Sequence, residues 1–161
     1  MTSAARRVDR ESIARSEDHC ALRVWLRLLT CTQLIERQVR SRLRGRFATT
    51  LPRFDLMAQL ERHREGLKMN ELSRMLMVTG GNVTAIVDQL EREGLVERLE
   101  GDDRRAWLIR LTSAGGKSFA EMAREHEGWV VELLAGLSRR EQEDLLKLLA
   151  KVKQHTVEVL S

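Results

Sequence analysis

The sequence predicts a mostly helical protein with one small β-hairpin, a winged helix-turn-helix placed between long helices at both ends of the chain. Three observations predict this fold. Apolar residues recur at three- and four-residue steps through most of the 161 residues. Two shorter helical segments meet at a Thr/Gly turn, and two β-prone segments follow them directly. The order helix, turn, helix, hairpin is more informative than any single element.

A long first helix is predicted over residues 18–45, and a shorter helix follows it. Side chains at helical spacing form one stripe in the first segment: Leu22, Trp25, Leu26, Leu29, Thr32, Ile35, Val39 and Leu43. Gly45 and the residues after it interrupt this stripe. The second helix is predicted to begin after Thr50, which suits an N-cap, with Pro52 in its first turn, and to end near His63.

The central segment has the pattern of a helix-turn-helix followed by a hairpin. Helices are predicted over residues 69–77 and from Gly80 to Glu93, with Thr79 as the N-cap of the second helix. Gly94 suits the position after that helix, because glycine adopts a positive φ at little cost. Residues 95–100 and 106–112 are β-prone and enclose the loop-forming residues 101–105, so we expect a two-stranded wing.

The last third of the chain is predicted to form further helices. Ser138 and Glu141 have the spacing of a capping box, which marks the start of the final helix. The long helices at both ends carry more apolar surface than the small central unit can cover, and a symmetric dimer would bury it. We therefore divide the chain into an N-terminal arm with a dimerisation helix (1–48), a winged unit (49–112) and C-terminal dimerisation helices (113–161).

The basic charge of the chain lies in its first third. Residues 1–50 contain 11 arginines against 5 acidic residues, whereas residues 67–112 contain 7 basic and 8 acidic residues. This distribution indicates a polyanion contact in the first third. No stretch approaches the ~18 consecutive apolar residues of a membrane span, and residues 1–15 lack the apolar segment of a secretion signal. We therefore expect a cytoplasmic protein.

No arrangement of side chains indicates an enzyme, a cofactor or a metal site. The four histidines are dispersed, and Gly80-Gly81 lacks the lysine of a phosphate-binding loop. The order of residues suggests no combined nucleophile, base and orienting group. Cys20 and Cys31 would lie ~16 Å apart on one helix, too far for a disulfide, so we expect two reduced thiols.

The segment from Leu51 to Thr112 resembles the MarR family of multiple antibiotic resistance regulators. The resemblance is carried by Leu-Pro-Arg-Phe-Asp-Leu (51–56), Asn-Glu-Leu-Ser-Arg-Met-Leu (70–76), Asn-Val-Thr-Ala-Ile-Val-Asp-Gln-Leu-Glu-Arg-Glu-Gly-Leu-Val (82–96), Asp-Asp-Arg-Arg-Ala (102–106) and the closing Leu-Thr (111–112). It implies a homodimer with interlocking terminal helices. It also implies a regulator that binds a pseudo-palindromic DNA operator, with the helix from Gly80 to Glu93 in the major groove.

The resemblance also assigns the DNA contacts. They are Thr79, Gly81, Asn82, Thr84, Ala85, Gln89 and Arg92 at the recognition helix, with Arg98, Arg104 and Arg105 from the hairpin. Asn82 and Gln89 suit adenine edges, and Arg105 would reach a narrow minor groove. Asp103 would support the wing rather than touch DNA. Many family members carry arginine where this chain has Ala85 and Gln89, so we expect phosphate contacts from the wing, Arg98 and the basic first third.

The resemblance further implies a small-molecule effector. Trp25, Phe54, Met57 and Trp129 are large apolar groups on helices that line the effector pocket in this family, although they also suit an ordinary core. The segments 51–56 and 79–84 look most like members that control aromatic-acid catabolism, including those that sense hydroxycinnamoyl-CoA thioesters. We therefore expect a repressor that a small aromatic acid or aryl-CoA releases from its operator.

Two features of the first helix leave alternatives open. Arg40 and Arg44 belong to an arginine-rich end, which suits a solvated face, a DNA backbone contact or a phosphate-bearing effector. Cys20 lies where the hydroperoxide sensors of this family place a reactive cysteine. Those sensors hold the thiolate with tyrosines, and this chain has none. A redox-sensing regulator and an effector-independent DNA-binding protein therefore remain as alternatives.

Overall fold

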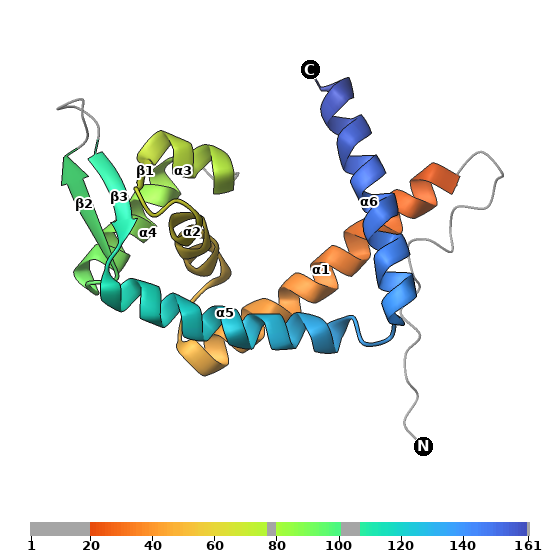
Figure 1. Ribbon diagram of the computed structural model, residues 1–161, viewed down its shortest axis with the longest axis horizontal. Helices are drawn as coiled ribbons and strands as arrows, with labels where there is room; N and C mark the ends of the chain where they lie inside the picture. The colour runs from red at the N-terminus through yellow and green to blue at the C-terminus, as the bar shows by residue number, and fades with distance from the viewer. Residues whose placement is uncertain (1–19, 77–79, 101–106, 161) are drawn as a thin grey trace. The chain divides into compact units, whose positions relative to one another are not determined.

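The computed structural model describes residues 20–76, 80–100 and 107–160, and it confirms a mostly helical fold with a small antiparallel sheet (Figure 1). The elements are α1 (Cys20–Phe47), α2 (Leu51–Arg62), β1 (Leu67–Lys68), α3 (Met69–Leu76), α4 (Gly80–Arg92), β2 (Val96–Glu100), β3 (Trp107–Leu111), α5 (Ser113–Leu133) and α6 (Arg139–Val159). The chain forms two compact units, Met1–Ala123 and Arg124–Ser161, which divide inside α5.

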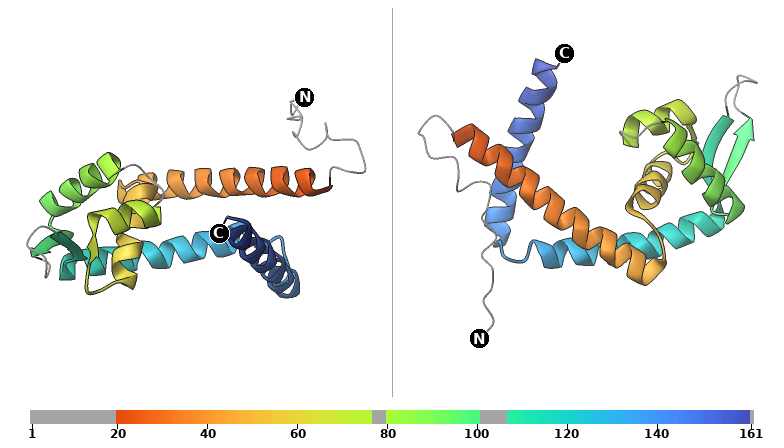
Figure 2. Two further views of the ribbon diagram at one scale, coloured as in Figure 1. Left: turned by 90° about the horizontal axis from the view of Figure 1, so that it is seen from above. Right: turned by 180° about the vertical axis from the view of Figure 1, so that it is seen from behind.

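Helix α1 extends beyond its predicted end. We expected Gly45 to interrupt it, but the helix runs on to Phe47, and Figure 2 shows it as one continuous element. A glycine inside a helix costs only about 1 kcal/mol relative to alanine, and burial of the neighbouring Leu43 favours the helical turn around it. The helix ends where Ala48 adopts a φ of 48°, and the Ala48 N–H donates to the carbonyl of Arg44 at 3.2 Å.

The start of the winged unit follows the predicted pattern with one addition. Helix α2 begins after Thr50 with Pro52 in its first turn, although the Thr50 side chain makes no capping hydrogen bond. The sequence did not predict β1, because a two-residue strand leaves no periodic signal. This strand pairs antiparallel with β3, Leu67 opposite Ile109, and so joins the start of α3 to the hairpin.

The sheet has the order β1-β3-β2, and the three winged-unit helices pack beside it. The predicted hairpin is present, with Val96 opposite Leu111 and Glu100 opposite Trp107. Each element contributes at least one side chain to the core between them. The core members with exposed fractions of 2% or less include Leu56, Met57, Leu60, Leu72, Val83, Val87, Leu90, Val96 and Ile109. Burial of these apolar groups is the main force that holds α4 against the sheet.

The base of the hairpin is closed by a compact set of hydrogen bonds. Gly94 ends α4 with a φ of 72°, as predicted. The Thr112 hydroxyl donates to the Gly94 carbonyl at 2.7 Å and accepts the Gly115 N–H at 3.0 Å. The Thr112 N–H donates to the Leu95 carbonyl at 3.1 Å. These bonds join the end of α4, the end of β3 and the first turn of α5.

The second unit contains the end of α5 and helix α6. The predicted capping box is confirmed, since the Ser138 hydroxyl accepts the Glu141 N–H while the Ser138 N–H donates to Glu141 Oε2 at 2.8 Å. These hydrogen bonds hold the pKa of the exposed Glu141 carboxyl below its ordinary value. None of the apolar side chains of α6 is buried within the chain. Its exposed apolar residues are Leu145, Leu146, Leu148, Leu149, Val152, Val157 and Val159.

The closure of the hairpin base predicts opposite effects for two adjacent glycines of α5. A Cβ at position 115 would lie 1.9 Å from the Leu95 carbonyl oxygen, whereas a Cβ at position 116 meets nothing within 4 Å. We expect Gly115→Ala to lower the free energy of unfolding by about 2 kcal/mol or more. Gly116→Ala should raise it by about 0.5–1 kcal/mol. Urea denaturation measures both, and equal effects at the two positions would contradict the close approach.

Candidate nucleic-acid interface

Helix α4 has one face in the core and one face toward solvent. Val83, Val87 and Leu90 are fully buried, and successive side chains are about 100° apart around the helix axis. The opposite face is therefore centred on Ala85 and Arg92, both of which are exposed. Asn82, Thr84 and Gln89, also predicted to contact DNA, are exposed beside them. Gly81 lies in the first turn of the same helix.

One flank of this exposed face is held by Arg98 of strand β2. Arg98 Nη1 donates to Glu91 Oε2 at 2.7 Å, and Nη2 pairs with the Asp88 carboxylate. The Arg98 side chain is 29% exposed. We expected this residue to contact DNA, but its guanidinium is already engaged with two carboxylates of α4. The sequence could not indicate this, because the partners come from different elements. We therefore leave Arg98 out of the DNA-binding surface proposed below.

The other flank is held by Arg53 of helix α2. Arg53 Nη1 donates to Glu93 Oε1 at 3.0 Å, and Nη2 pairs with the second carboxylate oxygen. Arg53 is 12% exposed and its Nε atom is buried without a hydrogen-bond partner in the described structure. Hydrogen bonding and charge from Arg53, with a hydrogen bond from Gln89, hold the pKa of Glu93 below its ordinary value of 4.5, although burial opposes this. Sequence reasoning missed this contact, since no pattern connects positions 53 and 93.

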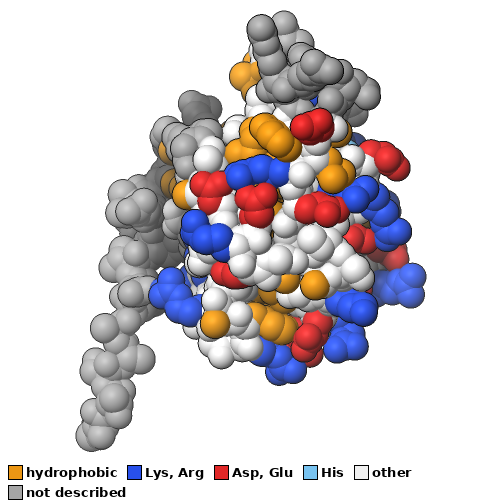
Figure 3. Space-filling view, turned by 90° about the vertical axis from the view of Figure 1, so that its left-hand side faces the viewer, with side chains coloured by type: hydrophobic (Ala, Val, Ile, Leu, Met, Phe, Trp, Pro, Cys, Tyr) orange, Lys and Arg blue, Asp and Glu red, His pale blue; other side chains and the backbone are white. Residues whose placement is uncertain are grey.

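These pairs change the charge that the helix presents. Asp88, Glu91 and Glu93 each pair with an arginine from another element. The negative charge of these three carboxylates on α4 is therefore balanced by Arg53 and Arg98. Arg110 and Glu97 form a further pair across the hairpin at 2.7 Å. Figure 3 shows acidic and basic side chains interleaved over the end of the winged unit that carries β2 and β3. The exposed face of α4 is accordingly polar and weakly basic.

The predicted wing residues Asp103, Arg104 and Arg105 and the predicted recognition-helix contact Thr79 are outside the described residues. Trp107, the first residue of β3, is 52% exposed, a large apolar group that sequence reasoning did not single out.

An arginine-lined hollow lies on the solvent-facing side of α1. It measures about 400 Å³ and is lined by Arg37, Arg40, Ser41, Arg44 and Gly45. Arg40 pairs with Glu36 at 3.3 Å, and both side chains are about half exposed (53% and 49%), so the pair is weak. Gly45 leaves open space at one side of the hollow. Of the arginines at this end of α1, Arg37, Arg40 and Arg44 line the hollow.

The four predicted effector-pocket residues occupy different environments. Phe54 is 6% exposed, with its ring centroid 5.4 Å from that of Phe119, and Met57 is 1% exposed. Trp25 is 57% exposed, and α1 rises about 33 Å from it to Phe47. Trp129 is buried and belongs to the second unit. Phe54 and Met57 therefore serve the core of the winged unit, and Trp25 lies apart from them.

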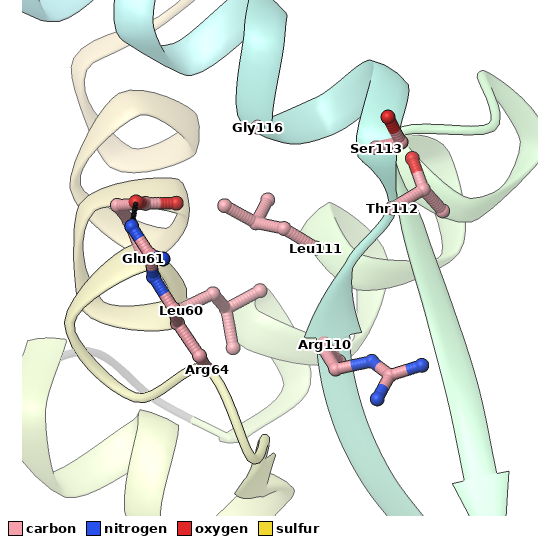
Figure 4. A pocket seen from close by; sticks show the side chains of 8 residues that line it. All are labelled: Leu60, Glu61, Arg64, Arg110, Leu111, Thr112, Ser113 and Gly116. Carbon is pink, nitrogen blue, oxygen red and sulfur yellow. Dashed lines mark hydrogen bonds and ion pairs between the residues drawn. The ribbon is translucent and has the colours of Figure 1, made fainter.

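A second hollow lies between α2, β3 and the start of α5. It measures about 200 Å³, less than the usual range for ligand pockets. Figure 4 shows Leu60 and Leu111 facing each other across it, with Glu61 and Arg64 paired at its rim. Arg110 extends toward β2, where it pairs with Glu97. Both arginines are thus already engaged by carboxylates.

The remaining candidate groups stay as predictions. Cys20 and Cys31 are free and exposed on α1, which is compatible with the expected reduced thiols. Within the described ranges, no three His, Cys, Asp or Glu side chains are placed together to hold a metal ion. No helix in those ranges has the length and apolarity to cross a membrane.

Two curated proteins of Bacillus subtilis resemble this chain. The "uncharacterized HTH-type transcriptional regulator YkoM" is 32% identical over 94 residues, which are 58% of this chain and 61% of that protein. The "uncharacterized HTH-type transcriptional regulator YdgJ" is 29% identical over 94 residues, 58% of this chain and 57% of its own length. The chain therefore matches less than two thirds of the length of these relatives.

Solved structures share the fold over a longer segment. A MarR family regulator from Silicibacter pomeroyi has a TM-score of 0.75 at 29% identity, covering 88% of this chain and 99% of that one. The apo form of Escherichia coli MarR has a TM-score of 0.70 at 26% identity, covering 78% and 93%. A mutant of that MarR in complex with operator DNA has a TM-score of 0.71 at 24% identity, covering 85% and 98%.

The helix pair α3 and α4 and the antiparallel hairpin of β2 and β3 together define a winged helix-turn-helix protein. Residues 49–106, which include α2, α3, α4 and β2, match the model of the MarR family. This match agrees with the resemblance that the sequence predicted. Both relatives from Bacillus subtilis are named as transcriptional regulators and not as enzymes.

The paired Glu93 predicts a pH-dependent contribution to stability. Glu93→Gln should lower the free energy of unfolding at pH 7 by about 0.5–1 kcal/mol, as expected for a partly exposed ion pair. Because the Glu93 pKa is lower in the folded protein than in the unfolded chain, this contribution is present above about pH 4.5 and is lost as the pH falls through the native pKa.

Urea denaturation of the wild type and the variant between about pH 7 and 3 measures this difference. Glu121→Gln, at an exposed position of α5, is the control for loss of a surface carboxylate. A gap between wild type and Glu93→Gln that stays constant down to the lowest pH would contradict the ion pair.

Proposed function

We propose that this protein is a dimeric transcriptional regulator that binds a pseudo-palindromic DNA operator through α4 and the wing. The observation that carries the proposal is the exposed face of α4, centred on Ala85 and Arg92 and flanked by two arginine–carboxylate clusters. A helix with such a face fits the major groove, where Asn82 and Gln89 provide donors and acceptors for base edges. The operator complex of the mutant Escherichia coli MarR, whose fold the chain shares, supports the same assignment.

The apolar face of α6 supports the dimer. Leu148 is 60% exposed, Val152 is 49% exposed and Val159 is 70% exposed, at helical spacing that places them along one side. An apolar stripe of this length in contact with water favours a second copy of the chain as its cover. Two winged units related by a two-fold axis would read two operator half-sites about one helical turn apart. We propose that the dimer binds its operator in the cytoplasm.

For the effector, we favour a small aromatic acid or its CoA thioester that releases the protein from DNA. The support is the arginine-lined hollow of α1, because guanidinium groups bind phosphates with paired hydrogen bonds. A CoA thioester brings several phosphates to one ligand, and Arg37, Arg40 and Arg44 extend over about 10 Å of helix axis. Release requires that the effector bind the DNA-free arrangement more tightly than the DNA-bound one.

The salt dependence of operator binding tests the DNA-binding surface. Each phosphate contact contributes about 0.9 to the slope of log affinity against log salt. Arg105→Ala should therefore lower the slope by about 2 for a dimer with two wings. The pair Arg98→Gln/Asp88→Asn keeps the net charge and should leave the slope near its wild-type value, because Arg98 is held within the domain.

The measurement is fluorescence anisotropy with an operator selected from random DNA, at several salt concentrations. An unchanged slope in Arg105→Ala would show that the wing does not engage DNA. A reduced slope in Arg98→Gln/Asp88→Asn would show that Arg98 contacts phosphate after all. A wild-type affinity equal for operator and random DNA would contradict a sequence-specific regulator.

A thermal-shift series tests the effector. Aryl-CoA thioesters should raise the melting temperature of the wild type, and Arg40→Gln/Arg44→Gln should weaken their binding about tenfold or more. Free aromatic acids carry one carboxylate in place of several phosphates, so the same double substitution should weaken their binding less than that of the thioesters. Arg139→Gln/Arg140→Gln on α6 is the matched control for charge. An aryl-CoA response that survives in Arg40→Gln/Arg44→Gln would remove the arginine hollow from the effector site.

A further inference from the structure

Trp107 is a large aromatic side chain that the fold leaves half in water at the start of strand β3. It is 52% exposed, and among the described residues of the winged unit Met75 is the other large apolar side chain that is exposed. Charged residues accompany it on the hairpin, with the exposed Glu100 directly opposite on β2 and Arg98 on the next rung. A single aromatic group among charges is not the broad apolar patch that a second protein surface covers.

The strand register places Trp107 on the α4 side of the hairpin. Paired residues of an antiparallel ladder lie on the same face of the sheet, and every second rung returns to that face. Trp107 and Glu100 therefore share a face with Ile109 and Arg98. Ile109 is fully buried in the core, and Arg98 pairs with two carboxylates of α4. Trp107 thus lies about 7 Å farther out along the hairpin, on the face that packs against α4.

A helix in the major groove leaves little room beside it. The groove is about 12 Å wide, and a helix with its side chains is about 10–12 Å across. A group next to the helix therefore meets the sugar–phosphate wall of the groove rather than a base edge. The carboxylate of Glu100, opposite Trp107, disfavours a phosphate beside the indole ring. The apolar face of a deoxyribose is the part of the wall that suits this ring.

We propose that Trp107 packs against a deoxyribose of the operator backbone, at the wall of the groove that α4 occupies. The inference rests on the proposed function, since it needs α4 in the major groove. Sugar contacts position a protein on DNA and carry no sequence information, and an uncharged ring releases no counterions. Trp107 therefore adds affinity without adding specificity or salt dependence.

The experiment is fluorescence anisotropy of the full-length protein with operator and with random DNA, at several salt concentrations. Trp107→Ala should weaken the binding of both DNAs by the same factor, about tenfold, because an apolar contact is lost. The ratio of the two affinities and the salt slope should stay at their wild-type values. Arg92→Gln, on the exposed face of α4, should instead lower the slope. Leu108→Ala, on the opposite face of β3, is the matched control and should bind like the wild type.

Tryptophan fluorescence gives a second measurement that does not require the alanine variant to fold. The chain has three tryptophans, and Trp25 on α1 is 57% exposed. Acrylamide is a neutral quencher, so the charge of DNA does not repel it. Operator DNA should reduce acrylamide quenching in the wild type and in Trp25→Phe, because it covers Trp107. In Trp107→Phe this protection should be lost.

The outcomes separate the two proposals. A wild type that binds operator and random DNA equally contradicts the proposed function, and the inference falls with it. A sequence-specific wild type whose affinity is unchanged in Trp107→Ala overturns the inference alone. So does a loss of affinity confined to the operator, which would indicate a base contact, or a lower salt slope, which would indicate an effect on phosphate contacts. Acrylamide protection in Trp107→Phe equal to that of the wild type also overturns it.

Discussion

The rest of the winged unit depends on the closure of the hairpin base around Thr112. One hydroxyl joins the carbonyl of Gly94 to the N–H of Gly115, and the neighbouring backbone bond reaches Leu95. Helix α5 approaches Leu95 so closely that no side chain fits at Gly115. The end of α4, both strands of the hairpin and the first turn of α5 therefore share one junction. A displacement of any one of them must move the others, since packed backbone has little room to deform.

The charged residues next to this junction decide what α4 presents to a partner. Arg98 and Arg53 come from different elements and approach the helix from opposite flanks. They pair with carboxylates that would otherwise repel phosphate, and their own guanidinium groups are engaged in these pairs. The proposed DNA-binding face is consequently built from neutral polar groups and Arg92. Its affinity for DNA must then depend on cations elsewhere, at the wing and in the first third of the chain.

The arginine hollow of α1 and the core of the winged unit have different roles in the proposed regulation. Phe54 and Met57 already fill the core, so a ligand among them would have to displace packed side chains. The hollow around Arg37, Arg40 and Arg44 is open to solvent and has chemistry suited to phosphates. Helix α1 ends beside α2, whose Arg53 holds the flank of α4. The hollow on α1 and the exposed face of α4 therefore belong to one compact unit, and helix α2 lies between them in the chain.

The sequence by itself determined the helices, the hairpin and the caps at Gly94 and Ser138, because each of these follows from local spacing and turn chemistry. Its motifs also carried the resemblance to the MarR family, whose model matches residues 49–106. Only the tertiary structure decided the strand β1, the continuation of α1 through Gly45, and the partners of Arg53 and Arg98. A two-residue strand has no period, and a glycine's effect depends on the burial of its neighbours. Ion pairs between residues 10 or 40 positions apart form when the core brings their elements together, and no local pattern records that. For this reason the sequence predicted Arg98 among the DNA contacts and could not indicate its two carboxylate partners on α4.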